Sequence, residues 1–124
     1  MKTKKIKIDE KLKNDIKSLC EEECQVIVHC SIFAYSFEGL RIWKNTNLID
    51  HHTGKKSILT HAENIPFYPQ AMVCERGKYH FTLFFKGLPK NCEVFDLFED
   101  IPEAGGFSKK NIQRNSSDVY QIKL

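Results

Sequence analysis

A chain of 124 residues is long enough to bury one hydrophobic core and too short for two ordinary domains. Hydrophobic residues make up 41% of it and charged residues 28%, which excludes a wholly disordered chain and a membrane-embedded one. The formal net charge of +3 is small and comes largely from lysines and arginines near the two ends, so we expect no nucleic-acid partner.

The N-terminal residues do not resemble a secretory signal peptide, because the basic opening MKTKKIKI runs into the charged stretch DEKLKNDIK. No apolar run approaches the ~20 residues that a membrane-spanning helix needs. The five cysteines are odd in number and irregular in spacing, unlike the disulfide framework of a small secreted domain. We therefore expect a cytoplasmic protein with reduced thiols and no membrane partner.

Residues 1–23 form a charged segment that we separate from the rest of the chain. Leu12, Ile16 and Leu19 recur at helical spacing, which favours a short amphipathic helix, whereas the alternation in KKIKI would suit a strand. We predict an N-terminal arm, helical or extended, over residues 1–23 and one folded domain over residues 24–124.

The domain has the pattern of a series of β-strands. The stretch QVIVHCSIFAY is rich in β-branched and aromatic residues and lacks a helical period, which predicts a buried strand. Two further apolar stretches flank a turn at Gly54, so residues 40–65 are predicted to form a β-hairpin. Pro66 and Pro69 have no backbone N–H to donate, which predicts a loop or an edge segment there.

Two strands with alternating apolar residues follow, KYHFTLFFK and CEVFDLFED, joined by a Gly-Leu-Pro turn. The polar stretch from residue 101 to residue 118 is expected to be a connection, and VYQIKL a last strand. Because no helical segment separates successive strands, the sequence predicts an all-β antiparallel sandwich or barrel. The predicted core residues are Phe81, Leu83, Phe85, Phe95 and Leu97.

The order of these motifs resembles a small immunoglobulin-like β-sandwich domain found in uncharacterised bacterial proteins. The resemblance rests on FTLFF, the Leu-Pro turn, VFDLFE and the loop ending in Gly-Gly-Phe, and it covers about residues 24–124. Lys86 departs from it, because an acid is expected at that position. The resemblance implies an immunoglobulin-like sandwich and provides no catalytic residues.

Four residues form the densest group of soft metal ligands: Cys20, Cys24, His29 and Cys30. Thiolate and imidazole are the ligands that zinc prefers, so a small zinc-binding protein is an alternative hypothesis. The usual C-x₂-C knuckle is missing, however, and strand alternation would send His29 and Cys30 to opposite faces. We therefore expect no metal or other cofactor, and buried free cysteines instead.

The acidic residues between Glu93 and Glu103 do not have the spacing of a calcium loop. Asp96 falls on a strand face with apolar neighbours, so we expect it to be partly buried with a hydrogen-bond partner, and we expect Glu99 to be solvated. No local signature marks a catalytic cysteine, and no glycine loop could cradle a phosphate. We predict that the protein is not an enzyme, with an enzyme of unrecognised type as a further alternative.

Four aromatic residues lie in predicted loops or at predicted edges: Trp43, Phe67, Tyr68 and Phe107. Exposed aromatic side chains at such places can anchor another protein, although the same residues could plug the ends of a sandwich. An open strand edge could also pair with a second copy of the chain. Our first hypothesis is a non-catalytic module that binds a protein partner or forms a homodimer through an edge strand.

Overall fold

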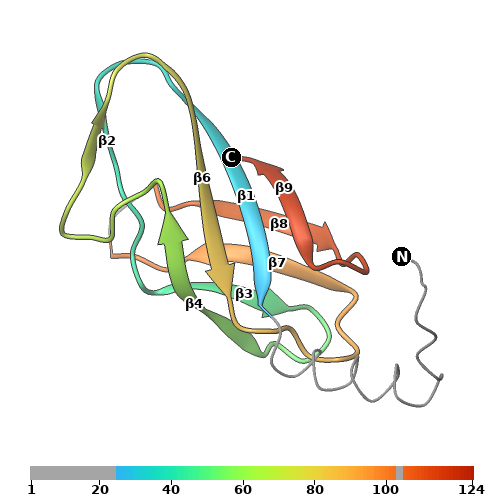
Figure 1. Cartoon of the computed structure of the whole chain (residues 1–124). Helices are drawn as coiled ribbons and strands as arrows, with labels where there is room; N and C mark the ends of the chain where they lie inside the picture. Colours follow the sequence, from blue (N-terminus) through green and yellow to red (C-terminus); the bar gives the residue numbers. More distant parts are fainter. Residues whose placement is uncertain (1–24, 103–104) are drawn as a thin grey trace, which may run out of the picture.

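The structure is a computed structural model that describes residues 25–102 and 105–124. The predicted N-terminal arm lies outside these residues, as do Cys20 and Cys24. The described residues form nine β-strands and contain no helix long and apolar enough to span a membrane (Figure 1). The strands are β1 (Val26–Ala34), β2 (Glu38–Leu40), β3 (Thr46–Asp50), β4 (Lys56–Glu63), β5 (Met72–Cys74), β6 (Gly77–Phe85), β7 (Val94–Glu99), β8 (Ser108–Gln113) and β9 (Val119–Lys123). The predicted all-β fold is confirmed.

Seven of the strands form one sheet in the order β8-β7-β3-β4-β6-β1-β9, while β2 and β5 pair in a separate two-stranded sheet. The large sheet is mixed, because β1 is antiparallel to β6 but parallel to β9. In Figure 1 the strands β6, β1 and β9 cross in front of β3, β7 and β8. The sheet therefore bends back over itself and nearly closes into a barrel.

Strand β4 makes the bend. Its first half pairs with β3, its second half pairs with β6, and the register shifts between Leu59 and His61. A shift of this kind is a β-bulge, which bends a strand and lets it pass from one layer of a fold to the other. The strand order thus gives no support to an immunoglobulin-like sandwich of two separately bonded sheets. Alternation in the sequence indicates which side chains face inward, but not that one strand pairs with different neighbours along its length.

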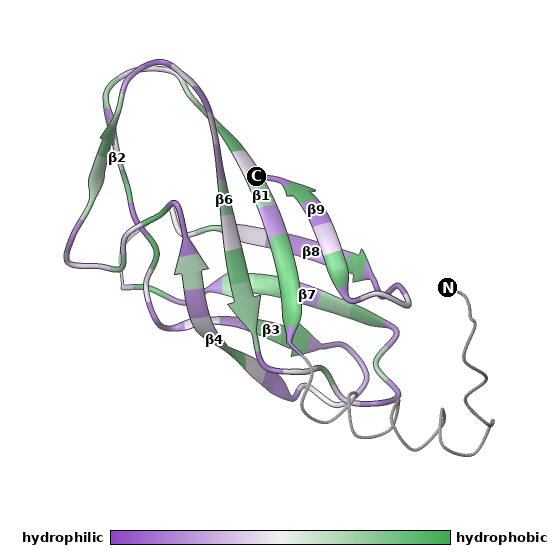
Figure 2. Cartoon of the chain, in the orientation of Figure 1, coloured by the Kyte–Doolittle hydropathy of each residue, from purple (hydrophilic) through white to green (hydrophobic). Residues whose placement is uncertain are grey.

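The core lies between the two layers. The five predicted core residues, on β6 and β7, are each at most 1% exposed. Strand β1 adds Val26, Val28 and Cys30, and the ring of Tyr120 on β9 meets that of Phe95 edge-on, with centroids 5.1 Å apart. Figure 2 shows hydrophobic residues alternating with polar ones along these strands. Burying each large apolar side chain stabilises the fold by about 1.5–3 kcal/mol.

Two strands differ from the sequence-based prediction. Residues 108–113, predicted to be a polar connection, form the edge strand β8, in which Ile112 alone is partly buried. Residues 38–40 form β2, whereas the sequence predicts a strand here only from residue 40, as the start of the hairpin. Neither strand has an inward apolar row, so neither has the alternation by which a half-buried strand is identified.

Candidate binding site

The structure brings Trp43 and Tyr68 into direct contact. Their rings are stacked, with centroids 3.7 Å apart and an interplanar angle of 12°. Two backbone hydrogen bonds fix the pair, because Ile42 N–H donates to Pro66 O at 2.9 Å and Tyr68 N–H donates to Ile42 O at 2.8 Å. The proline-bounded loop is therefore held against the chain just before Trp43. Tyr68 keeps 47% of its surface exposed.

Trp43 and Phe107 line one cavity of about 250 Å³. On one side the cavity is bordered by β2 and Arg41, and on the other by the end of β7 and the segment that follows it. The ring of Phe107 is partly buried and packs near that of Phe81, with centroids 5.6 Å apart. Phe107 thus plugs this end of the core and forms part of the cavity wall.

Phe67, the remaining aromatic candidate, does not reach this cavity. It is partly buried against the core and forms an isolated bridge with Ile42. The Lys44 ammonium lies 5.8 Å from the centre of its ring. Its position supports the loop under Tyr68, and it offers little surface to a partner.

Glu99 is a buried carboxylate in the cavity wall. It is 4% exposed, its Oε2 accepts a hydrogen bond from Trp43 N–H at 2.9 Å, and its Oε1 accepts one from Phe107 N–H at 2.9 Å. The expectation that Glu99 is solvated is wrong. Its position two and four residues after the buried Leu97 and Phe95 is the signal that could have shown it, because alternate strand residues share a face.

The paired glycines let the chain fold back onto Glu99. Gly105 has a φ of +93°, which side-chain-bearing residues rarely adopt, and a Cβ on Gly106 would lie 2.7 Å from the carbonyl oxygen of Glu99. The glycines therefore permit a close approach of the backbone to Glu99. That approach brings Phe107 N–H to the carboxylate.

The indole N–H of Trp43 is buried and has no hydrogen-bond partner among the described residues. Buried polar groups are nearly always paired, and an unpaired one costs about 1–3 kcal/mol. Trp43 also lines the cavity, so this unpaired donor belongs to a residue of the candidate site.

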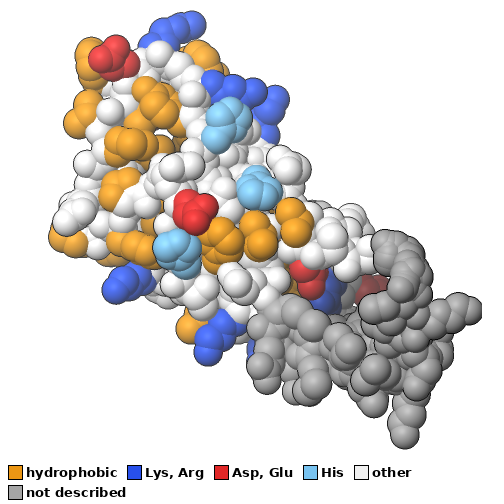
Figure 3. Space-filling view, in the orientation of Figure 1, with side chains coloured by type: hydrophobic (Ala, Val, Ile, Leu, Met, Phe, Trp, Pro, Cys, Tyr) orange, Lys and Arg blue, Asp and Glu red, His pale blue; other side chains and the backbone are white. Residues whose placement is uncertain are grey.

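Exposed apolar side chains gather near the cavity, before β2 and on β5. Tyr35, Phe37 and Val73 are 71%, 75% and 73% exposed, and the ring of Phe33 meets that of Tyr35 edge-on at 4.8 Å. Val73 pairs with Gly39 in the two-stranded sheet. Figure 3 shows hydrophobic side chains gathered on the side of the molecule where Figure 1 places β2. We call Phe33, Tyr35, Phe37, Tyr68 and Val73 the aromatic end.

The zinc ligands considered above do not come together within the described residues. Cys30 is buried in the core, whereas His29 Nδ1 lies 3.0 Å from Thr82 Oγ1 on the other face of the sheet. Burial raises the pKa of the Cys30 thiol to about 12, which keeps it protonated and a poor ligand. No group of three or more potential metal ligands is found among residues 25–102 and 105–124.

Asp96 holds two strands together. Its Oδ1 accepts a hydrogen bond from Asn111 N–H at 2.9 Å and lies 2.6 Å from His51 Nε2. Burial by itself would raise the pKa of Asp96, but these two hydrogen bonds and the charges of His51 and Lys110 hold it below its ordinary value. The contacts join β7 to β8 and to the β3–β4 turn, which is a structural role.

Comparisons with models of known protein families, with curated proteins and with solved structures find no match. The geometry itself defines a class, an all-β domain with an exposed aromatic end beside a small cavity. The resemblance to an immunoglobulin-like domain of bacterial proteins stays a prediction.

Proposed function

We propose that the protein is a non-catalytic binding module that recognises another protein through the aromatic end. The observation that supports this most is the exposure of Tyr35, Phe37 and Val73 within one small part of the fold. Aromatic side chains are enriched at protein interfaces, and contiguous apolar patches on a protein surface commonly mark interaction sites. Covering such surface favours association, because it removes apolar area from water.

The aromatic end also has the polar border that interfaces commonly have. Glu38, Glu75 and Arg76 are exposed beside the apolar side chains, and the Arg76 guanidinium lies 5.4 Å from the centre of the Phe33 ring. An apolar centre with a charged rim supports a specific contact, because the rim orients the partner while the centre supplies affinity.

A homodimer through an edge of the large sheet is less well supported. Edge strand β8 exposes Lys109 and Lys110, and edge strand β9 exposes Lys123. Lysines on edge strands are a common protection against pairing with another copy, because like charges would face each other. A second copy could still bind at the aromatic end, and light scattering after size-exclusion chromatography would detect it.

Selection of peptides from a phage-displayed random library on the immobilised protein tests the proposal. We expect enriched peptides to bind the wild-type protein and to lose about tenfold or more in affinity for the Tyr35→Ser/Phe37→Ser variant, as expected for interface anchors. The matched control is Phe98→Ser, which removes a 42% exposed aromatic ring from β7. The proposal fails if no peptide is enriched, or if the double variant binds as well as the control.

A further inference from the structure

The outer face of strands β9, β1 and β6 carries an open groove of about 490 Å³. Strand alternation directs polar side chains to this face, away from the buried residues Cys30, Phe81 and Ile122. Figure 3 shows histidine side chains on the face where Figure 1 places β6 and β1. The register between the strands sets the polar side chains of the groove in two rows: Gln121, His29 and Thr82 in one, and Lys123, Ser31 and His80 in the next.

The two rows lie close together. Neighbouring strands are ~4.8 Å apart and alternate residues of one strand are ~7 Å apart, so the six side chains cover an area of about 10 Å by 7 Å. A small group placed between the rows can therefore contact side chains from all three strands.

These six side chains can all donate hydrogen bonds, and no carboxylate lines the groove. One contact joins two of them, because His29 Nδ1 lies 3.0 Å from Thr82 Oγ1. That contact leaves Nε2 of His29 for a ligand. The side chains of Ser31, His80, Gln121 and Lys123 have no hydrogen bond or ion pair within the described part of the chain. The groove thus has several donors available and no anion of its own.

The charges around the groove favour an anionic ligand. Lys123 has a fixed positive charge, and histidine side chains such as His29 and His80 gain one on protonation between about pH 5 and 8. Lys78 precedes His80 by two residues on β6 and lies on the same face. A positively charged lysine beside two imidazoles disfavours a metal cation at this place.

An acid on the same face, Glu63 of β4, lies opposite Thr82 and does not line the groove. His61 Nε2 is 3.8 Å from its carboxylate, so a further imidazole stands beside this acid. Glu63 therefore borders the groove without supplying a negative charge inside it.

We infer that this groove binds the phosphate group of a small organic phosphate. A phosphate group has three strong acceptor oxygens and a charge of about −1.5 to −2 at neutral pH, which suits a lysine, two imidazoles and two hydroxyl groups on three strands. The groove volume falls within the ~300–1,000 Å³ of most small-molecule sites and leaves room for the organic part. This site is separate from the aromatic end and does not depend on the proposed function.

An NMR titration with glycerol phosphate at constant ionic strength tests the inference. We expect the imidazole peaks of His29 and His80 and the amide peaks of β1, β6 and β9 to shift. The imidazole peaks of His51 and His52, at the β3–β4 turn, are the internal control and should stay in place. Shifts confined to the control histidines, or no shifts at all, overturn the inference.

The variant Lys123→Gln tests the charge directly. We expect it to bind glycerol phosphate about fivefold or more weakly, because a charge-assisted hydrogen bond is lost. The matched control Lys109→Gln removes the same charge from exposed β8, outside the groove, and should bind as wild type does. Equal affinities of Lys123→Gln and wild type, or equal losses in the two variants, overturn the inference.

Sulfate isolates the part played by the histidines, because its own charge does not change between about pH 6 and 8. We expect wild type to bind sulfate more weakly at the higher pH, and His29→Gln/His80→Gln to lose this dependence. A sulfate affinity of wild type that is independent of pH overturns the inference. Binding to phosphatidylglycerol vesicles without binding of glycerol phosphate also overturns it, because the phosphate would then belong to a lipid surface.

Discussion

Glu99 shows how one buried side chain can hold the candidate site together. Its carboxylate accepts N–H groups from Trp43 and from Phe107, residues that are 56 and 8 positions away along the chain. The sequence contains the signal for the inward position of Glu99, which is its alternation with Leu97 and Phe95. It contains no signal for the two partners, because they meet Glu99 only after β7 has packed and the glycine loop has turned back.

Replacement of this carboxylate by an amide is expected to destabilise the fold. In Glu99→Gln, one of the two N–H groups faces an NH₂ group and loses its acceptor, which lowers the free energy of unfolding by about 1–3 kcal/mol. Urea denaturation measures the change, and the matched control is Glu93→Gln at an exposed position just before β7. Equal midpoints for wild-type and Glu99→Gln proteins would show that the two backbone contacts do not stabilise the fold.

Gly106 is expected to tolerate no side chain. A Cβ added at this position would lie 2.7 Å from Glu99 O and within 3.3 Å of Ile101 side-chain atoms, so Gly106→Ala forces the loop away and costs about 1–3 kcal/mol of unfolding free energy. In the control Gly39→Ala, the new Cβ meets Ala71 Cβ at an ordinary 3.6 Å. Thermal unfolding of the two variants should therefore differ, and similar melting temperatures would contradict this account.

At the scale of elements, the sequence indicates most strands but not their neighbours. Strands β1, β6, β7 and β9 each have apolar residues in phase, which is why they could be predicted. Strand β8 could not, because an edge strand with a solvated surface needs no apolar row. Of the aromatic residues at the candidate site, the predicted loops and edges single out Trp43, Tyr68 and Phe107. They do not single out Phe33, Tyr35 and Phe37, because alternation does not show which aromatic side chains stay exposed. That Trp43 stacks on Tyr68 depends on the bridge between Ile42 and Phe67, a contact that alternation does not encode.

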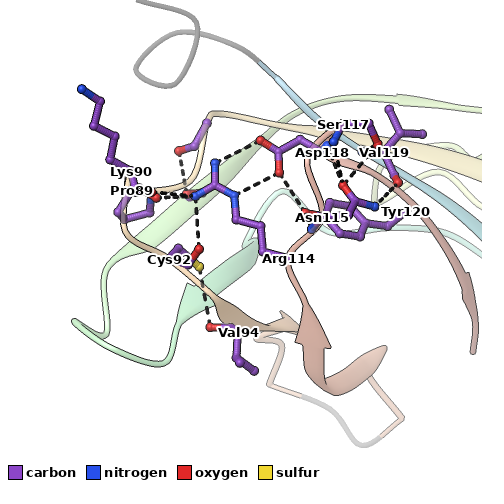
Figure 4. Close-up of polar contacts among 12 residues, drawn as sticks. Pro89, Lys90, Cys92, Val94, Arg114, Asn115, Ser117, Asp118, Val119 and Tyr120 are labelled. Carbon is purple, nitrogen blue, oxygen red and sulfur yellow. Dashed lines mark hydrogen bonds and ion pairs between the residues drawn. The ribbon is translucent and has the colours of Figure 1, made fainter. Parts of the chain in front are cut away.

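The gap between the edge strands β8 and β9 is closed by side chains. Figure 4 shows Arg114, which follows β8, directed at Asp118, which precedes β9. Its Nε and Nη2 atoms donate to the two carboxylate oxygens at 3.2 Å and 3.1 Å, and its Nη1 donates to Pro89 O at 2.5 Å. Tyr120 O–H donates to the same carboxylate at 2.8 Å. Arg114 thus ties the β6–β7 connection to the start of β9.

Arg114→Gln is expected to weaken the contact between the β6–β7 connection and the start of β9, and so to destabilise the fold. The side chains of Arg114 and Asp118 are only 12% and 18% exposed, so loss of the guanidinium leaves a poorly solvated carboxylate and is expected to cost about 2–4 kcal/mol of unfolding free energy. A double-mutant cycle with Asp118→Asn, measured by urea denaturation, isolates the pair, and Lys109→Gln on exposed β8 is the control. Strictly additive effects of the two substitutions would contradict a direct coupling.

At the scale of the whole molecule, the buried titrating groups predict how stability depends on pH. The groups that determine stability at acidic pH are Asp50 and Asp96. Burial raises the pKa of Asp50, but hydrogen bonds from Thr53 and His52 outweigh it and hold that pKa below its ordinary value. A carboxyl group with a lowered pKa in the fold stabilises it above the unfolded-state pKa, and this stabilisation is lost as the pH falls through the folded-state value.

We therefore expect the free energy of unfolding to decrease as the pH falls below about 4. Asp50→Asn should be less stable than wild type at neutral pH, and the difference between the two should shrink on acidification. Denaturation series in urea at several pH values measure this. A constant difference between wild type and Asp50→Asn would show that Asp50 has no lowered pKa in the fold.

At alkaline pH one of the groups that determine stability is Cys30, whose thiol is 2% exposed and whose pKa burial raises from 9.0 to about 12. Burial raises the pKa of Cys92 and of Tyr120 in the same direction. A thiol whose pKa is raised by folding stabilises the fold fully at pH values below the unfolded-state pKa. This stabilisation is lost as the pH rises from the unfolded-state pKa towards the folded-state pKa, because the unfolded chain releases its proton first. The unfolding free energy should then fall by about 1 kcal/mol per pH unit per such thiol.

Cys30→Ala should be less stable than wild type at neutral pH. Above pH 9.0 it should lose less unfolding free energy than wild type does, so that the stabilities of the two proteins converge. Urea denaturation of both proteins across this range measures the slopes, and parallel slopes would contradict a buried, protonated Cys30.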